Sequence, residues 1–305
     1  MKKKVKQIVL PLLTAFIWGS AFVAQKGGAG VLGALSFNWT RSLMAALGLS
    51  VLVWVLDRRS DKPQKSGTER KQDRRALLRG GLIVGTILAV GSTLQQYGVG
   101  MTTAGKAGFL TALYIVLVPL FGLLFGSRVR PLIWCGVAVA LVGLYFLSFA
   151  SGGGGGFNRG DLLLIACAFV FSSHILAIDH FTKTLDGVKL SCVQFFVAGI
   201  ELLIAALFVE GFPARAILDC MPFILYTGLI SGGVGYTLQI LAQKDGDPAV
   251  VSLLLSLEAF FAAVSGAVVL HERLSAREYL GCALMLCAVV LVQLPGKKAR
   301  ETDKA

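Results

Sequence analysis

The chain has 305 residues, of which 55% are hydrophobic and only 15% are charged, and its mean hydropathy is +0.75. Soluble domains carry about 25% charged residues, so this composition excludes an ordinary soluble enzyme and indicates lipid as the solvent. The net charge of +12 could indicate a protein that binds nucleic acid. The distribution of the charge argues against such binding, because the basic residues lie in short segments between apolar stretches.

We predict ten membrane spans, because ten apolar stretches approach the ~20 residues that a helix needs to cross a bilayer. No connection between them is long enough for a separate soluble domain. In chain order the predicted spans are Ile8–Ala24, Leu35–Leu56, Ala76–Val99, Gly105–Phe125, Leu132–Phe149, Leu162–Ile178, Leu190–Val209, Met221–Leu241, Val250–Leu270 and Tyr279–Leu294.

The first segment, Met1–Ala24, has the lysine-rich start and apolar run of a secretory signal peptide, a segment that is normally cleaved. We interpret it as a retained span. Ala15-Phe16-Ile17-Trp18 matches Ala168-Phe169-Val170-Phe171, 153 positions later, so cleavage would remove part of an internal repeat.

The repeat extends over both halves of the chain. Thr93-Leu94-Gln95 recurs as Thr237-Leu238-Gln239, 144 positions later, and the next apolar stretch begins near Ala104 in one copy and Pro248 in the other. An odd number of spans per copy forces the second copy into the opposite orientation, an arrangement that recurs in secondary transporters.

These patterns predict an all-α integral membrane protein, with ten transmembrane helices as two inverted five-helix repeats around a central cavity. The repeats are 8–149 and 162–294, and a Gly-rich outer linker, 150–161, joins them.

The basic residues predict the orientation. Of the 29 Lys and Arg residues, 22 fall on the side of both termini, six on the other side, and Arg41 within a span. Positive charge accumulates on the cytoplasmic side, so we expect a multi-pass protein of the plasma (inner) membrane with cytoplasmic termini. The basic loop Asp57–Arg79 has an alternative role in binding anionic lipid headgroups.

Motifs of soluble enzymes are absent. The sequence contains no Walker loop and no HExxH, and its three histidines lack metal-site spacing. The six cysteines form no CxxC pair, which favours packing roles. We therefore predict no cofactor, no metal and no catalytic residue. Ser172, Ser173 and His174 are adjacent, but neighbours on a helix point in different directions.

Four ionisable residues lie well inside predicted spans, away from the span ends: Arg41, His174, Glu201 and Glu258. Each costs ~2.5–3.5 kcal/mol at mid-helix, so such residues normally face a partner or a watery cavity. Arg41 could pair with Glu201 or Glu258. These four residues could form structural ion pairs, or they could take part in coupling transport to an ion.

Neutral polar and aromatic side chains at comparable depths could line a substrate cavity with aromatic walls and a few polar groups. The repeat partners Gln95 and Gln239 should lie on opposite walls. The alternatives are interface anchoring by the aromatic residues and helix–helix ties by the glutamines. The candidates are Trp18, Phe22, Gln25, Gln95, Thr111, Tyr114, Ser172, Tyr236 and Gln239.

Several of these segments resemble the EamA type of the drug/metabolite transporter superfamily across about residues 8–294. The resemblance implies a basket of ten helices with a central cavity, alternating access, and export of small metabolites, amino acids among them. The family usually has proline where this chain has Ala259. The resembling segments are Phe16–Phe22, Arg41 with Ala45, Thr93–Gln95, Ala104–Gly108, Leu257–Ala263, Glu272–Leu274 and Gly281.

The resulting hypothesis is a secondary transporter, an exporter of small polar or amphipathic, amino-acid-like metabolites. Its partners would be a small-molecule substrate and the lipid bilayer, with no nucleic acid, in a monomer or homodimer. The alternatives are an importer or exchanger of the same fold, and a non-transporting scaffold or intramembrane enzyme.

Overall fold

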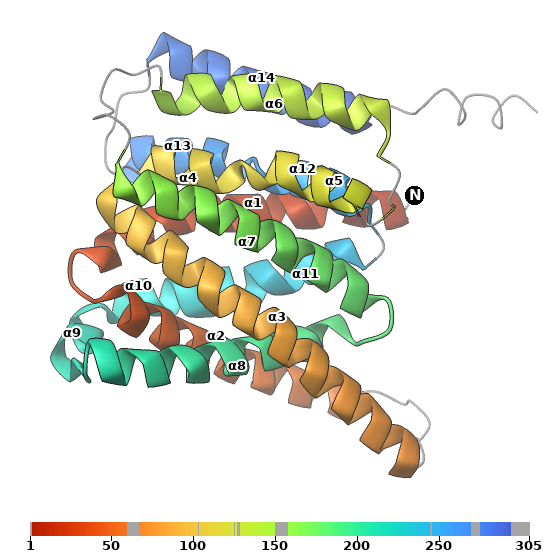
Figure 1. Cartoon of the computed structure of the whole chain (residues 1–305), viewed down its shortest axis with the longest axis vertical. Coiled ribbons are helices and arrows are strands. Elements are labelled where there is room, and N and C mark those ends of the chain that lie inside the picture. The colour runs from red at the N-terminus through yellow and green to blue at the C-terminus, as the bar shows by residue number, and fades with distance from the viewer. Residues whose placement is uncertain are drawn as a thin grey trace, which may run out of the picture.

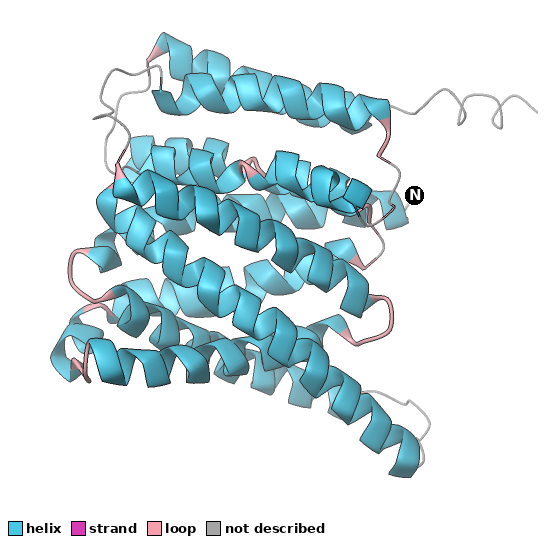
Figure 2. Ribbon diagram, viewed as in Figure 1, coloured by secondary structure: helices cyan, strands magenta, loops and turns pink. Residues whose placement is uncertain are grey.

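The computed structural model describes residues 2–59, 67–102, 104–124, 126, 129–149, 158–244, 246–269 and 275–293. Within these ranges every regular element is helical (Figure 2). The elements are α1 (Lys2–Ala29), α2 (Ala34–Arg58), α3 (Gly67–Met101), α4 (Ala104–Ala112), α5 (Tyr114–Leu124), α6 (Pro131–Phe149), α7 (Arg159–Thr182), α8 (Gly187–Val209), α9 (Ala214–Asp219), α10 (Met221–Leu225), the π-helical η1 (Tyr226–Gly235), α11 (Tyr236–Gln243), α12 (Pro248–Leu255), α13 (Glu258–Val269) and α14 (Ala276–Gln293).

Eight stretches of the described chain are long and apolar enough to cross a membrane, and they coincide with eight of the ten predicted spans. Three of them combine shorter helices: α4 with α5, α10 with η1 and α11, and α12 with α13. At the other two predicted spans, α6 and α14 are helical, and α6 supplies a shorter apolar stretch. The all-helical class is confirmed, whereas crossing by α6 and α14 stays a prediction.

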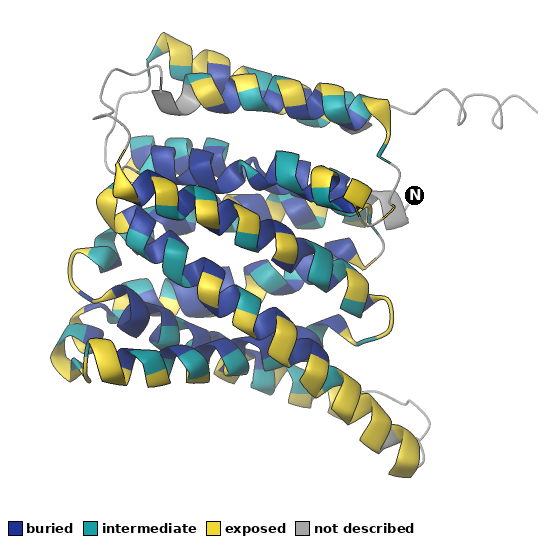
Figure 3. Cartoon of the chain, viewed as in Figure 1, coloured by how far each residue is buried: buried dark blue, intermediate teal, exposed yellow. Residues whose placement is uncertain are grey.

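The N-terminal part of α3 differs from the predicted basic loop. Residues from Gly67 onward are helical, and this part of α3 is exposed and projects beyond the bundle (Figure 3). A helix of 35 residues is about 52 Å long at 1.5 Å per residue. Because the hydrocarbon core is only ~30 Å thick, an untilted α3 must extend into water. Residues 60–66 lie outside the described part of the chain.

Two helix pairs form opposite edges of the bundle, α6 with α14 and α2 with α8, and the other membrane helices lie between them (Figure 1). The largest apolar cluster joins α1, the end of α3, α4, α5, α6, α7, α12, α13 and α14. Large apolar side chains also point outward, such as Phe208 at 87% and Leu124 at 81% exposure. That surface suits lipid rather than water.

The edge pair α2–α8 is antiparallel, because the ends of the two helices contact each other crosswise. The Glu210 carboxylate, just past α8, accepts hydrogen bonds from the backbone N–H groups of Leu35 (3.0 Å) and Ser36 (2.8 Å) at the start of α2. At the other end Lys189 pairs with Asp57 at 2.8 Å. The two carboxylates are 153 positions apart in sequence, the spacing found between the first spans of the two copies. This contact pattern fits an inverted two-repeat architecture.

Small residues let the central helices approach closely, as membrane helices require. A Cβ atom at Gly19 in α1 would lie 2.5 Å from the Phe261 Cβ and 2.6 Å from the Glu258 carbonyl oxygen of α13. Only glycine fits there, and the contact fixes how α1 lies against the broken span α12–α13.

Candidate functional site

Two helix breaks meet near the centre of the bundle. The fourth span stops at Ala112 and resumes at Tyr114, and the ninth stops at Leu255 and resumes at Glu258. Tyr114 and Glu258 are 144 positions apart, the spacing of the repeated glutamines, so they occupy equivalent positions in the two copies. The Tyr114 hydroxyl donates a hydrogen bond to the Glu258 carboxylate at 3.0 Å. Two equivalent residues that touch must lie beside the pseudo-twofold axis.

A cavity opens at this point, between helices of both copies. Eleven of the thirteen predicted site residues line it, and the structure adds three that the sequence-based prediction missed. The predicted residues in the lining are Trp18, Phe22, Gln25, Arg41, Gln95, Thr111, Tyr114, His174, Tyr236, Gln239 and Glu258, and the added ones are Phe171, Ile175 and Ser231.

Two of the three missed residues follow from the repeat itself. Phe171 and Ile175 lie 153 positions after Trp18 and Phe22, so they present the same face of the first span in the second copy. Applying the repeat register to each candidate would have found both. Ser231 has no such signal, because it lies in η1, whose wider turn is not visible in the sequence.

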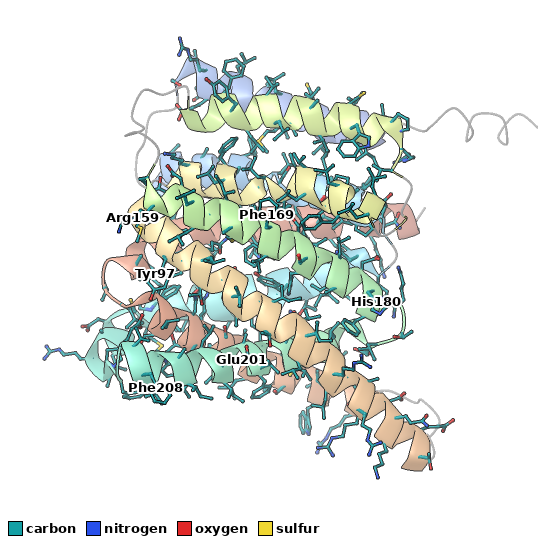
Figure 4. All side chains as sticks on the ribbon, viewed as in Figure 1. Tyr97, Arg159, Phe169, His180, Glu201 and Phe208 are labelled. Atoms are coloured by element: carbon teal, nitrogen blue, oxygen red, sulfur yellow. The ribbon has the colours of Figure 1, made fainter. Side chains whose placement is uncertain are left out.

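Two predicted residues lie elsewhere. Glu201 accepts a hydrogen bond from the Thr86 hydroxyl at 2.7 Å, on the outward face where α8 passes beside α3 (Figure 4). Ser172 is fully buried, and its hydroxyl bonds to the Ala168 carbonyl of its own helix at 2.6 Å. Neither lines the cavity. The structure therefore places the predicted cavity residue Ser172 outside it, and it gives Glu201, predicted as a buried charge, a hydroxyl partner in Thr86.

One basic and one acidic side chain line the cavity without pairing with each other. The Arg41 Nε donates to the Asn38 Oδ1 at 2.8 Å, and its guanidinium lies over the Phe37 ring at 5.7 Å. Asn38 is held in turn by a bond to the Ser92 carbonyl at 2.9 Å. In the described chain Arg41 forms no ion pair, so neither of the two pairings left open by the sequence, with Glu201 or with Glu258, is present in this structure.

His174 is fixed in the wall of the cavity. Its Nε2 lies 3.2 Å from the Gln194 Oε1, and its ring contacts Tyr236 at 6.0 Å between centroids. The Tyr236 ring also lies 4.6 Å from that of Trp18, whose Nε1 donates to the Ser231 carbonyl at 3.3 Å. Aromatic rings from both copies therefore form one continuous wall.

Several buried polar atoms in the lining have unused hydrogen-bonding capacity. The Gln25 Oε1, the Gln239 Oε1 and the Thr111 Oγ1 have no partner in the described structure. An unsatisfied buried group costs about 1–3 kcal/mol, so each requires water or a ligand. The two glutamine oxygens are acceptors and favour a ligand that carries N–H donors.

The cavity is contracted in this state. Its volume is about 30 Å³, whereas one water molecule needs roughly 10–15 Å³ by the same measure. A metabolite site typically offers about 300–1,000 Å³. At one end of the bundle α4 packs on α7, and at the other end α12 packs on α1. The helices must therefore separate before a metabolite can enter.

The family follows from comparison with known proteins. A model described as "EamA-like transporter family" matches residues 5–149 and again 158–294. The chain belongs to this family. A relative named "Uncharacterized transporter" from Archaeoglobus fulgidus is 31% identical over 287 residues, covering 92% of this chain and 84% of its own length.

A second relative, "Uncharacterized inner membrane transporter YedA" of Escherichia coli K12, is 27% identical over 302 residues, covering 94% of this chain and 92% of its own length. A solved crystal structure of a protein 17% identical to this EamA-family chain has a TM-score of 0.74, covering 94% of this chain and 96% of the other. That likeness shows the fold alone. The family, the fold and the membrane spans together show a multi-pass membrane transporter.

Within the described residues, no three His, Cys, Asp or Glu side chains gather closely enough to hold a metal ion. All six cysteines are free thiols. The amides, hydroxyls, aromatic rings, guanidinium and carboxyl group that line the cavity suit reversible binding.

Proposed function

We propose that the protein is a secondary transporter that exports small polar or amphipathic, amino-acid-like metabolites by alternating access. One observation carries the proposal: the Arg41 guanidinium and the Glu258 carboxylate line the same cavity without pairing with each other. A zwitterion would satisfy both, its carboxylate at Arg41 and its ammonium group at Glu258.

Other groups in the lining support the same ligand. The unpartnered acceptor oxygens of Gln25 and Gln239 suit additional ammonium N–H donors. The rings of Trp18, Phe22 and Tyr236 suit an apolar side chain, as aromatic walls of small-molecule sites do. A non-transporting scaffold would gain nothing from leaving such polar atoms unsatisfied.

The test is transport in proteoliposomes loaded with an equimolar mixture of the twenty amino acids, with release followed by mass spectrometry. Arg41→Gln and Glu258→Gln should each lower the rate of release at least about tenfold, because a charge-assisted contact is worth roughly 1.5–3 kcal/mol. Glu201→Gln is the matched control, a carboxylate of similar depth outside the cavity, and should keep the wild-type rate.

Release by Arg41→Gln at the wild-type rate would refute the zwitterion. Net uptake in cells expressing the protein would favour the alternative, an importer or exchanger of the same fold. Imposed pH gradients test coupling through Glu258: if this carboxylate carries the coupled proton, Glu258→Gln folds normally and loses the dependence on the gradient.

The proposed orientation places both termini in the cytoplasm. The basic residues support it, because the end of the bundle at which α1 begins also holds the exposed Lys71, Lys183 and Lys244. Single-cysteine labelling with an impermeant reagent on intact cells should mark position 159, an exposed arginine at the start of α7, and not position 71. The reverse pattern would overturn the orientation.

A further inference from the structure

A buried ion pair joins α4 to α7 at one end of the bundle. We call this the Lys106 end, and the opposite end, where α12 begins, the Asp247 end. The Lys106 Nζ lies 2.7 Å from the Asp161 Oδ2, and the side chains are only 6% and 0% exposed. Asp161 is held in place by Asn158, whose backbone N–H donates to the same carboxylate at 2.8 Å.

The inverted repeat supplies an internal comparison. Lys106 lies 144 positions before Val250 in α12, and Asp161 lies 153 positions after Ile8 in α1. At the Lys106 end α4 packs on α7, and at the Asp247 end α12 packs on α1. The positions equivalent to the charged pair at the Lys106 end are therefore two half-buried apolar residues at the Asp247 end.

These two kinds of contact respond in opposite ways to water. Charges that leave a buried pair recover their hydration, and a buried pair is often no more stable than apolar residues of similar volume. Exposing apolar side chains to water costs about 25 cal/mol of free energy for each Å² of surface. Separating the helices is therefore less costly at the Lys106 end than at the Asp247 end.

We propose that the Lys106–Asp161 pair makes the Lys106 end a gate that water opens readily, while apolar contacts seal the Asp247 end. The proposal rests on alternating access as the proposed function. It gives the two ends of the transporter unequal tendencies to open, although the fold repeats itself.

The test measures access to the cavity and needs no substrate. Ser231→Cys, in a background without other cysteines, places one thiol in the cavity lining. An impermeant thiol reagent is then added from each side of the membrane, and labelling of Arg159→Cys shows which side is the Lys106 end.

Single and double replacements of the pair should act in opposite directions. Lys106→Met or Asp161→Asn leaves one buried charge uncompensated, so labelling of the Ser231→Cys thiol from the Lys106 end should rise at least about tenfold. The double variant Lys106→Val with Asp161→Ile copies the other end, and labelling from the Lys106 end should fall about tenfold. The control Lys183→Met breaks an exposed pair with Asp179. It should leave labelling of the Ser231→Cys thiol from both ends unchanged.

Faster labelling of the double variant than of wild type would overturn the proposal, because the pair would then hold the end shut. Unchanged labelling in all variants would show that the pair is no gate. If the single variants fail to fold, the double variant still decides. Absence of transport with these labelling changes intact would refute the proposed function and leave the gate standing.

Discussion

The hydrogen bond between the two helix breaks can be measured by a double-mutant cycle. Tyr114 and Glu258 are each only 2% exposed, so bulk solvent does not reach the contact that Tyr114→Phe removes. A hydrogen bond to a charged group contributes about 1.5–3 kcal/mol. We expect Tyr114→Phe to lower the free energy of unfolding by about 2 kcal/mol, with much the same loss in Glu258→Leu.

In the double variant both partners are apolar, so the losses should not add, and the coupling energy should be about 1.5–3 kcal/mol. The assay is equilibrium unfolding in mixed micelles, followed by tryptophan fluorescence. Tyr226→Phe is the control: its hydroxyl lies 2.6 Å from the Ser20 Oγ in a half-buried site, where a neutral bond contributes about 1 kcal/mol.

A cost for Tyr114→Phe no larger than for Tyr226→Phe would refute the reasoning, as would a coupling energy below about 0.5 kcal/mol, which is within the scatter of additive pairs. Either result would mean that the contact at the pseudo-twofold axis does not hold the two breaks together in the closed state.

Three further outcomes follow from the packing and the polar contacts. Gly19→Ala should destabilise the protein by about 1–3 kcal/mol through overpacking against α13, whereas Gly100→Ala, whose nearest neighbour would lie 3.8 Å away, should not; thermal unfolding of both in detergent compares them. Gln239→Leu should slow transport while keeping the folded yield, and a lost yield at unchanged transport per molecule would make it a packing residue. Glu210→Ala should lower the free energy of unfolding by about 1 kcal/mol, since it removes the only side chain that caps α2 in the described structure. Faster hydrogen exchange at the Leu35 backbone N–H would report this loss.

Sequence periodicity and the repeat predicted most of the residues that line the cavity. Gln95 and Gln239 come from equivalent helices and reach the same space, as their register indicated. Depth in a span was a weaker guide, because it does not give the direction of a side chain. Glu201 is as deep in sequence as the cavity residues, yet it faces Thr86 on the outward side.

The two helix breaks could not be predicted. The chain interrupts the helices at Leu113 and at Ser256–Leu257, none of which is a helix breaker such as proline or glycine. Ala259 stands where the family usually has proline, yet the ninth span is still broken just before this position. Pro119 lies inside α5 without ending it. The breaks therefore arise from tertiary contacts, such as the bond between Tyr114 and Glu258, and not from local propensity.

The crosswise contacts between α2 and α8 have a consequence for how the two halves depend on each other. The first half cannot complete its own α2, because the carboxylate that satisfies Leu35 and Ser36 belongs to residue 210. Expressed alone, the first half would leave the start of α2 without its cap, and the second half would leave Lys189 without its partner Asp57. Co-expressed as two separate chains, the halves should associate and fold together. A transporter cut within residues 150–157 should therefore recover its fold without a covalent link between the halves.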